Sequence, residues 1–83
     1  MTVRTERTPN PAAMKFSVGT AVGGPATIAD HALAEGWVAD VLALDGVTSV
    51  FMTADFVTVT ATPDVDWNVL APGVVEILEA EFG

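Results

Sequence analysis

The sequence of 83 residues contains no cysteine, so it can form no disulfide and can offer no thiolate to a metal ion or an iron–sulfur cluster. Its single histidine, His31, has no second imidazole and no thiol with which to share a metal, and we interpret it as a surface residue. A thiol nucleophile is excluded, and no base can be identified for the strand threonines Thr58 and Thr60. We therefore expect no enzyme activity, no catalytic residue, no bound metal and no cofactor.

Positive charge is also scarce. Three lysine and arginine residues stand against 11 aspartates and glutamates, which gives a formal net charge of −8. Phosphate backbones and anionic membranes repel such a surface, so we expect no nucleic-acid partner and no membrane partner. No stretch approaches the roughly 20 apolar residues of a membrane span, and residues 1–11 carry charges and prolines where a signal peptide has its apolar run. These absences predict a cytoplasmic protein.

Apolar residues, in contrast, are abundant. The chain is 51% hydrophobic and 17% charged, a composition typical of a folded protein rather than a disordered one. Its length suits one small domain, which we place over residues 1–83. Without disulfides, that domain must take its stability from a packed core.

The first part of the chain predicts two short strands joined by a proline-rich corner. Residues 3–8 form a charged edge strand, in which Val3 and Arg7 face one way, and residues 14–18 form a second strand. Between them, Pro9 and Pro11 lack the N–H group that a β-ladder needs. We interpret this corner as a rigid turn that joins two edge strands.

The next 20 residues are less regular. Residues 19–26, GTAVGGPA, lack the Gly-Lys-Ser/Thr of a phosphate-binding loop, and we predict a flexible connection there. Apolar residues recur at helical spacing from Asp30 to Leu44, but Gly36 costs about 1 kcal/mol in a helix relative to alanine. One long helix is one interpretation. We favour the other, which is a helix from about 36 to 44 preceded by a turn and ended by Gly46.

Residues 47–61 give the strongest strand pattern, because β-branched and aromatic residues flank one polar turn at Ala54-Asp55. We predict a hairpin in which Met52 lies opposite Val57, since that register separates the residues into two chemically different faces. The apolar face then consists of Val50, Met52, Val57, Val59 and Ala61. The mixed face consists of Ser49, Phe51, Thr53, Phe56, Thr58 and Thr60.

A second helix is predicted after Asp66, which can cap it, with a kink or an irregular turn at Pro72. Its apolar stripe consists of Trp67, Leu70, Val74, Ile77 and Leu78. The order strand, strand, helix, strand, strand, helix predicts an α+β fold. We expect a two-layer sandwich, in which a four-stranded, mostly antiparallel sheet carries two helices on one face and leaves the other largely open.

Five residues are candidates for contact with a partner. Arg4, Arg7 and Lys15 are the only basic residues, and all lie on the first two predicted strands. They can attract a carboxylate, a phosphate or an acidic segment, although solvation of an edge strand also explains them. Phe51 and Phe56 lie on the threonine-rich face, where exposed rings would mark an interaction surface unless a loop such as residues 19–30 covers them.

Three segments of the chain, taken in order, carry a family resemblance. VRTERTPNPAAMKF (residues 3–16), ALDGVTSVFMTADFVTVT (residues 43–60) and VDW (residues 65–67) resemble the N-terminal domain of Nfu-type, or NifU-like, iron–sulfur cluster scaffold proteins. The resemblance implies the two-layer fold described above. In that family a separate C-terminal domain holds the cluster with a Cys-x-x-Cys pair, which this cysteine-free sequence does not contain.

The resemblance implies a non-enzymatic protein-interaction module that lacks the cluster-binding Cys-x-x-Cys domain. Its expected partner is a protein or peptide, and an iron–sulfur assembly factor is the candidate that the resemblance favours. The alternative is a stand-alone peptide- or phosphopeptide-binding domain unrelated to iron–sulfur assembly.

We predict that this chain holds no iron–sulfur cluster after purification, because it offers no thiolate ligand. The purified protein would be incubated with iron and sulfide under anaerobic conditions, desalted and scanned in the visible range. No charge-transfer absorbance should remain. A stable absorbance band with stoichiometric iron would contradict the prediction.

Overall fold

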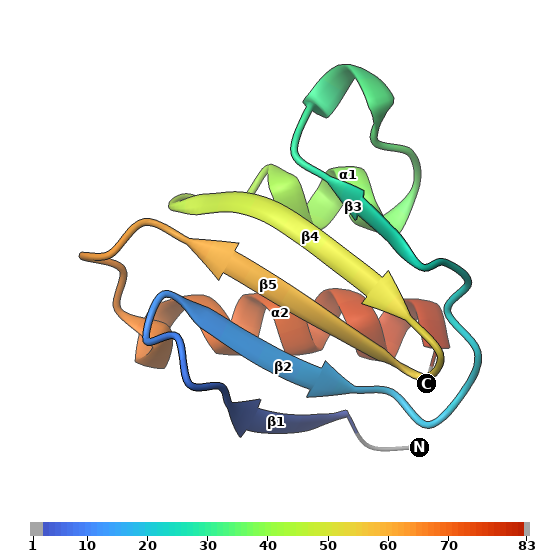
Figure 1. Ribbon diagram of the computed structural model, residues 1–83, viewed down its shortest axis with the longest axis horizontal. Coiled ribbons are helices and arrows are strands. Elements are labelled where there is room, and N and C mark those ends of the chain that lie inside the picture. The colour runs from blue at the N-terminus through green and yellow to red at the C-terminus, as the bar shows by residue number, and fades with distance from the viewer. Residues whose placement is uncertain (1–2, 83) are drawn as a thin grey trace.

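Alternating apolar residues build a single antiparallel sheet in the computed structural model, which describes residues 3–82 (Figure 1). The strand order is β1-β2-β5-β4-β3, and every neighbouring pair is antiparallel. The strands are β1 (Arg4–Arg7), β2 (Ala13–Ser17), β3 (Ala26–Ile28), β4 (Val47–Thr53) and β5 (Phe56–Ala61). The helices are α1 (Trp37–Leu42), α2 (Trp67–Phe82) and the short 3-10 helix η1 (His31–Leu33).

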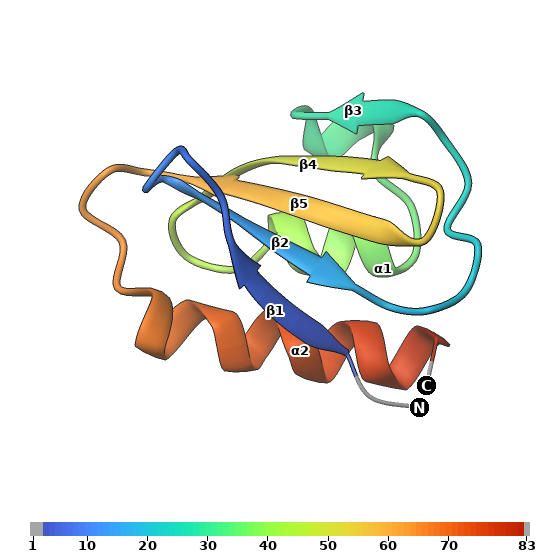
Figure 2. The same cartoon turned by 60° about the horizontal axis from the view of Figure 1, so that its bottom comes forward.

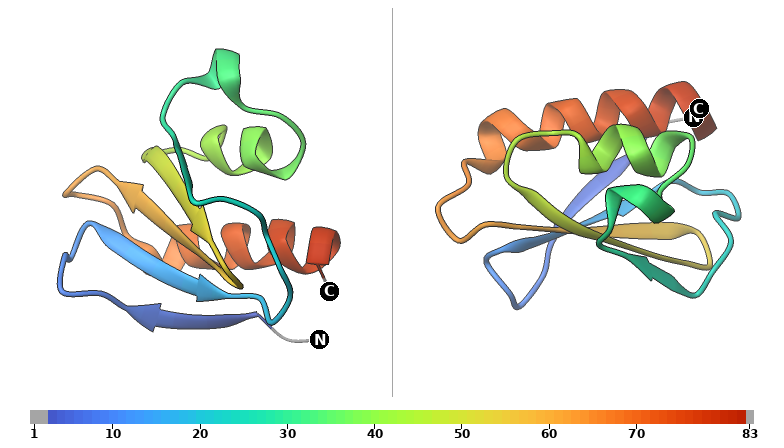
Figure 3. Two further views of the ribbon diagram at one scale, coloured as in Figure 1. Left: turned by 45° about the vertical axis from the view of Figure 1, so that its right-hand side comes forward. Right: turned by 90° about the horizontal axis from the view of Figure 1, so that it is seen from above.

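The two α-helices lie on the same side of the sheet, so the molecule has two layers (Figures 2 and 3). Figure 1 looks onto the opposite face, which no helix covers among the described residues. The two-layer α+β architecture is therefore confirmed, with both helices on one face as predicted.

The sheet has five strands, whereas the sequence predicted four in the order ββαββα. The additional strand, β3, forms at the end of the glycine-rich segment and pairs with β4, so that Ala26 lies opposite Met52 and Ile28 opposite Val50. A strand of three residues is too short to give a recognisable alternating pattern. The order with five strands also makes β2 an interior strand between β1 and β5, and not an edge strand as expected.

The segment before β3 is bound to the β4–β5 turn. The Val18 N–H donates to the Asp55 carbonyl at 2.9 Å, and the Val22 N–H donates to the Ala54 carbonyl at 2.9 Å. These bonds satisfy backbone groups that a flexible connection would leave to water. The segment predicted as a flexible connection is therefore anchored at Val22, wraps the end of the hairpin, and carries the chain to the far edge of the sheet, where its last residue, Ala26, begins β3.

The predicted hairpin register is confirmed. Met52 lies opposite Val57 and Val50 opposite Val59, and the side chains of Val50, Val57 and Val59 are completely buried. From the neighbouring strand, Phe16 lies opposite Val57 and is also completely buried. The apolar face of the hairpin thus forms the centre of the core.

The helical segment after β3 is divided, as the favoured interpretation predicted. The Asp30 carboxylate accepts the Ala32 N–H at 2.9 Å and caps η1, while Gly36, at φ 58°, precedes α1. Helix α1 is shorter than the predicted range of residues 36–44. Gly46 follows it with φ 91°, a left-handed conformation that a glycine adopts without strain.

Helix α2 begins where the sequence predicted. The Asp66 carboxylate accepts the Asn68 N–H at 2.9 Å, and the side chains of Leu70, Val74 and Leu78 are buried against the sheet. Pro72 is exposed and the helix continues through it without a break, although the sequence predicted a kink or an irregular turn. The proline lies on the solvent side, so it does not disturb the packed face.

We predict that Leu70→Ala lowers the free energy of unfolding by roughly 2–4 kcal/mol, because it leaves a cavity under the sheet. The matched control is the adjacent Val69→Ala, which removes apolar atoms from a side chain that is 75% exposed. That control should change stability by about 0.5 kcal/mol or less. Urea denaturation of both variants measures the difference, and equal losses would contradict the packing described here.

We predict that Gly24→Ala is more destabilising than Gly23→Ala by roughly 1–3 kcal/mol, the range for forced overpacking. Both glycines have a positive φ, so both substitutions carry similar backbone strain. A Cβ atom at Gly24 would collide with the Met52 backbone carbonyl, whereas one at Gly23 would meet nothing within 4 Å. Thermal unfolding of the two variants tests this, and similar melting temperatures would show that β3 is not held closely against β4.

Candidate interaction surface

Cross-strand pairing brings four of the five predicted contact residues to one face of the sheet. Lys15 lies opposite Thr58, which in turn lies opposite Phe51. In the next row, Arg4 lies opposite Ser17, which lies opposite Phe56. Residues paired directly across antiparallel strands project to the same side. We call this side, which carries Arg4, Lys15, Phe51 and Phe56, the open face.

The two phenylalanines of the open face partly cover one another. The ring centroids of Phe51 and Phe56 lie 6.4 Å apart with an interplanar angle of 54°. The Lys15 Nζ atom lies 4.5 Å from the centroid of the Phe56 ring, within the range of a cation–π contact. Both rings are half-buried rather than bare. Within the loop that was the alternative cover for the rings, residues 19–30, residues 26–28 extend the sheet at its edge instead (Figure 3).

The charges of the open face are weakly coupled. Lys15 Nζ lies 3.9 Å from the Glu6 carboxylate, and both side chains keep a third or more of their surface in solvent. An exposed pair of this kind contributes about 0–1 kcal/mol. The ammonium group of Lys15 is therefore held near Phe56 and Glu6 without being withdrawn from an incoming ligand.

Arg7 lies on the other side of the sheet. It is opposite Met14, whose side chain is buried in the core. Arg7 lines a hollow of about 220 Å³ together with Pro9, Pro11 and Trp67. The structure thus divides the predicted basic patch: Arg4 and Lys15 belong to the open face, whereas Arg7 lies toward the start of α2.

The proline-rich corner is held by its own hydrogen bonds. The Asn10 N–H donates to the Thr8 hydroxyl at 3.2 Å, and the Ala12 N–H donates to the Asn10 side-chain carbonyl at 2.9 Å. The Trp67 indole N–H donates to the Pro11 carbonyl at 3.1 Å. The corner is therefore a fixed turn, as predicted, and it ties the β1–β2 hairpin to the first turn of α2.

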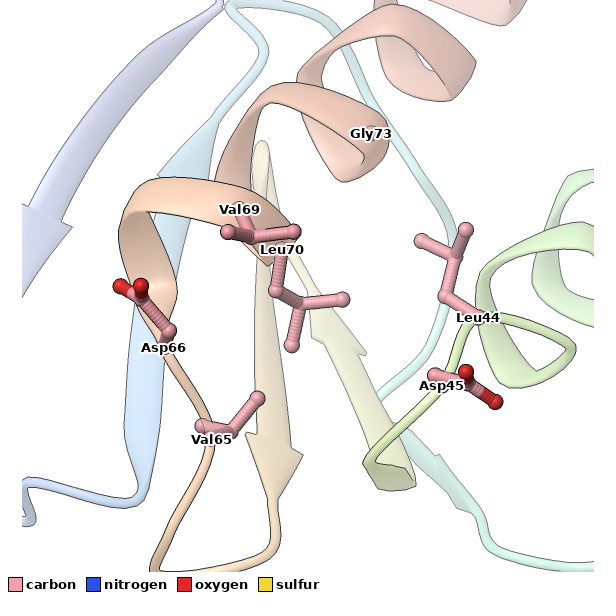
Figure 4. Close-up of a pocket in the computed structure, with 7 residues that line it drawn as sticks. All are labelled: Leu44, Asp45, Val65, Asp66, Val69, Leu70 and Gly73. Carbon is pink, nitrogen blue, oxygen red and sulfur yellow. The ribbon is translucent and has the colours of Figure 1, made fainter.

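Sequence reasoning missed a hollow between the two helices (Figure 4). Its volume is about 300 Å³, and it lies between the C-terminal end of α1 and the N-terminal half of α2. Its lining includes the apolar residues Leu44, Val65, Val69 and Leu70, with Asp45 and Asp66 at its sides. The signal in the sequence was Val69, an apolar residue outside the core stripe of α2.

Two other features, a metal site and a membrane-spanning helix, are absent from the described residues. Within residues 3–82, no three histidine, cysteine, aspartate or glutamate side chains are grouped so that they could hold a metal ion. In the same part of the chain, no helix combines the length and the apolar character needed to cross a membrane.

Comparison with known proteins gives relatives along almost the entire chain. Residues 3–83 match the sequence profile of the family described as "Scaffold protein Nfu/NifU N terminal". The chain is 37% identical over 82 residues to NifU-like protein 5, mitochondrial, of Arabidopsis thaliana. That alignment covers 94% of this chain and 30% of that protein. It is 38% identical over 84 residues to Conserved virulence factor C of Staphylococcus saprophyticus, covering 95% of this chain and 22% of that protein.

A third relative is the NFU1 iron-sulfur cluster scaffold homolog, mitochondrial, of Drosophila ananassae. It is 30% identical over 85 residues, which cover 94% of this chain and 29% of that protein. The chain thus spans less than a third of the length of these curated relatives.

Solved structures share the fold. The crystal structure of protein SAV1430 from Staphylococcus aureus superimposes with a TM-score of 0.74 at 25% identity, covering 93% of this chain and 98% of that one. The solution structure of a NifU-like protein from Saccharomyces cerevisiae gives a TM-score of 0.77 at 24% identity, covering 98% of this chain and 79% of that one, and shows the fold alone. Since the profile match extends over residues 3–83, the chain belongs to the Nfu/NifU N-terminal family, as its three resembling segments predicted.

Proposed function

We propose that this domain is a non-enzymatic protein-interaction module whose partner binds the open face. The observation that supports this most directly is the pair Phe51 and Phe56 on a sheet face that neither helix covers. Aromatic rings supply a large apolar area, and an apolar cluster on an otherwise polar surface commonly marks a site of association. The threonines around the rings provide a polar rim.

Electrostatics gives the expected character of the partner. Two cations, Lys15 and Arg4, lie on the open face with one carboxylate, Glu6, while the chain as a whole carries a net charge of −8. An acidic segment would be attracted toward this local positive potential and repelled elsewhere. We therefore infer that the contact surface of the partner combines apolar and acidic residues.

The family supports an iron–sulfur assembly factor as the partner. Relatives of this chain are named NifU-like proteins and iron-sulfur cluster scaffold homologs, and the matching profile describes the N-terminal part of such scaffolds. Because the sequence contains no cysteine, we propose that this domain contributes contacts to such a system and no ligands to a cluster.

A second candidate function is binding of an extended peptide or phosphopeptide at the β1 edge. Strand β1 is the last strand of the sheet, so its outer backbone groups face away from β2. A peptide can add a strand at such an edge, and Arg4 could then hold a phosphate or carboxylate. The short length of β1 and its charged residues oppose this function, because both features discourage strand addition.

We predict that Lys15→Gln weakens capture of the partner, whereas Arg7→Gln does not. Each substitution removes one positive charge, but only Lys15 lies on the open face. The immobilised variants would be incubated with extract of the source cells, and bound proteins quantified by mass spectrometry. Lys15→Gln should reduce capture by roughly 1.4- to fivefold, the equivalent of the 0.2–1 kcal/mol of an exposed ion pair. Arg4→Gln combined with Lys15→Gln should reduce it further.

The identity of the captured proteins separates the two functions. Enrichment of iron–sulfur assembly proteins, unchanged by prior phosphatase treatment of the extract, is the result expected for the first function. Capture that phosphatase abolishes would favour phosphopeptide binding instead. If Arg7→Gln were the damaging substitution and Lys15→Gln had no effect, the open face would not be the binding site.

A further inference from the structure

The hollow between the helices continues along α2 as one groove. A second hollow of about 370 Å³ lies between α1 and the C-terminal half of α2, and it shares Leu44 and Gly73 with the first. We call the two together the helix groove. On α2 its lining runs from Val69 to Ala80. These 11 helical steps of 1.5 Å correspond to about 17 Å, the length of a helix of about three turns.

The helix groove has an apolar floor. Leu44 and Leu70 line the first hollow, and Trp37 and Ile77 line the second. Gly73 lies where the two hollows meet, and because it has no side chain the Leu44 side chain can lie against α2 at this point. A Cβ atom there would lie 3.6 Å from the Leu44 side chain, which is ordinary contact.

The rim of the helix groove is acidic. Asp45 and Asp66 line the first hollow, Asp40 and Glu76 line the second, and all four residues are exposed. In Figure 4 the carboxylates of Asp45 and Asp66 point away from the apolar side chains, toward opposite sides of the hollow. Among the described residues that line the groove, none is basic.

The acidic rim belongs to a wider charge separation. Of the 11 acidic residues, Glu6 lies on β1 and Asp55 in the β4–β5 turn, so 11 minus 2 leaves nine in or beside the three helices. Of the three basic residues, Arg4 and Lys15 lie on the open face, and Arg7 lies on the helix side but does not line the groove. The helix side of the molecule therefore presents a negative surface around an apolar groove.

We propose that the helix groove binds an amphipathic helix of a partner protein, with apolar residues on one face and lysine or arginine along its flanks. The apolar face would cover Leu44, Leu70 and Ile77, and the basic flanks would lie against the rim carboxylates. Charge complementarity selects this occupant, since an acidic helix would meet like charges on both sides. Helices commonly bind in this way when a groove offers an apolar floor of matching length.

This site is separate from the open face, because the helices and the open face lie on opposite sides of the sheet (Figure 2). A basic helix and an acidic, apolar surface are partners of different chemistry. The two sites can therefore be tested independently, and the failure of one leaves the other standing.

The test uses a defined probe, a fluorescein-labelled synthetic helix of about 15 residues composed of leucine on one face and lysine on the other. Fluorescence anisotropy should show saturable 1:1 binding to the 83-residue chain, which weakens as sodium chloride is raised from about 0.05 to about 0.5 M. A peptide of the same pattern with glutamate in place of lysine should not bind. Amide NMR shifts on titration should concentrate at Leu44, Gly73 and Ile77.

Two quadruple variants, each with four substitutions, separate binding in the groove from general attraction to a negatively charged protein. The groove variant carries Asp40→Asn, Asp45→Asn, Asp66→Asn and Glu76→Gln. The control carries Glu35→Gln, Asp55→Asn, Asp64→Asn and Glu81→Gln, four exposed residues that do not line the groove. Each removes four negative charges, and asparagine at position 66 keeps a capping oxygen for α2. Affinity should fall about tenfold or more in the groove variant and about threefold or less in the control.

A third variant, Gly73→Leu, should block the floor of the groove and reduce affinity without changing net charge. Lys15→Gln on the open face should leave affinity for the Leu/Lys probe unchanged. The proposal would be overturned if the two quadruple variants lost affinity for the probe equally, or if the NMR shifts lay on the open face. So would a concentration-dependent dimer that the groove variant alone abolishes, because the occupant would then be a second copy of this chain.

Discussion

The register of the β4–β5 hairpin, with Met52 opposite Val57, is the constraint on which the remaining structure depends. Side chains alternate along a strand, so this register directs Val50 and Val59 toward the helices and Phe51 to the opposite side. A slip by one residue would exchange these sets and bury polar threonines in the core. Since the helices cover one face only, the pairing that creates the core also creates the open face. Core and candidate surface are therefore two consequences of one register.

The sequence predicted the parts of the fold that strong side-chain patterns determine. The hairpin register, the cap at Asp66 and the division of the helical segment at Gly36 all follow from local chemistry, and the structure confirms them. Strand β3 could not be predicted in this way, because its residues become a strand only through pairing with β4. The path of the chain before β3 depends on backbone hydrogen bonds to Ala54 and Asp55 in the β4–β5 turn. Hydrogen bonds between backbone groups cannot be recognised from the pattern of side chains.

The candidate site could likewise be predicted only where a local side-chain pattern determines it. Phe51 and Phe56 were assigned to a common face by alternation alone, and the structure confirms that placement. The grouping of Arg7 with Lys15 failed because it used chain proximity rather than alternation. Arg7 shares its orientation with Val3, and Val3 is buried in the core, so the apolar residue indicated which side Arg7 would take. The helix groove depends on how far apart two helices lie, which no local pattern specifies.

Charge separation follows from the same division into layers. The helices and their flanking turns hold nine of the 11 acidic residues, and Arg7 is the one basic residue on the helix side, so the two sides of the sheet differ in electrostatic character. A small domain with one core has little interior to give to a catalytic pocket, but both of its outer faces remain available. If the open face binds an acidic, apolar surface and the helix groove binds a basic helix, the two partners would not compete. A domain of this kind would then serve a scaffold by holding two proteins on opposite sides of a single sheet, a role that needs no cysteine.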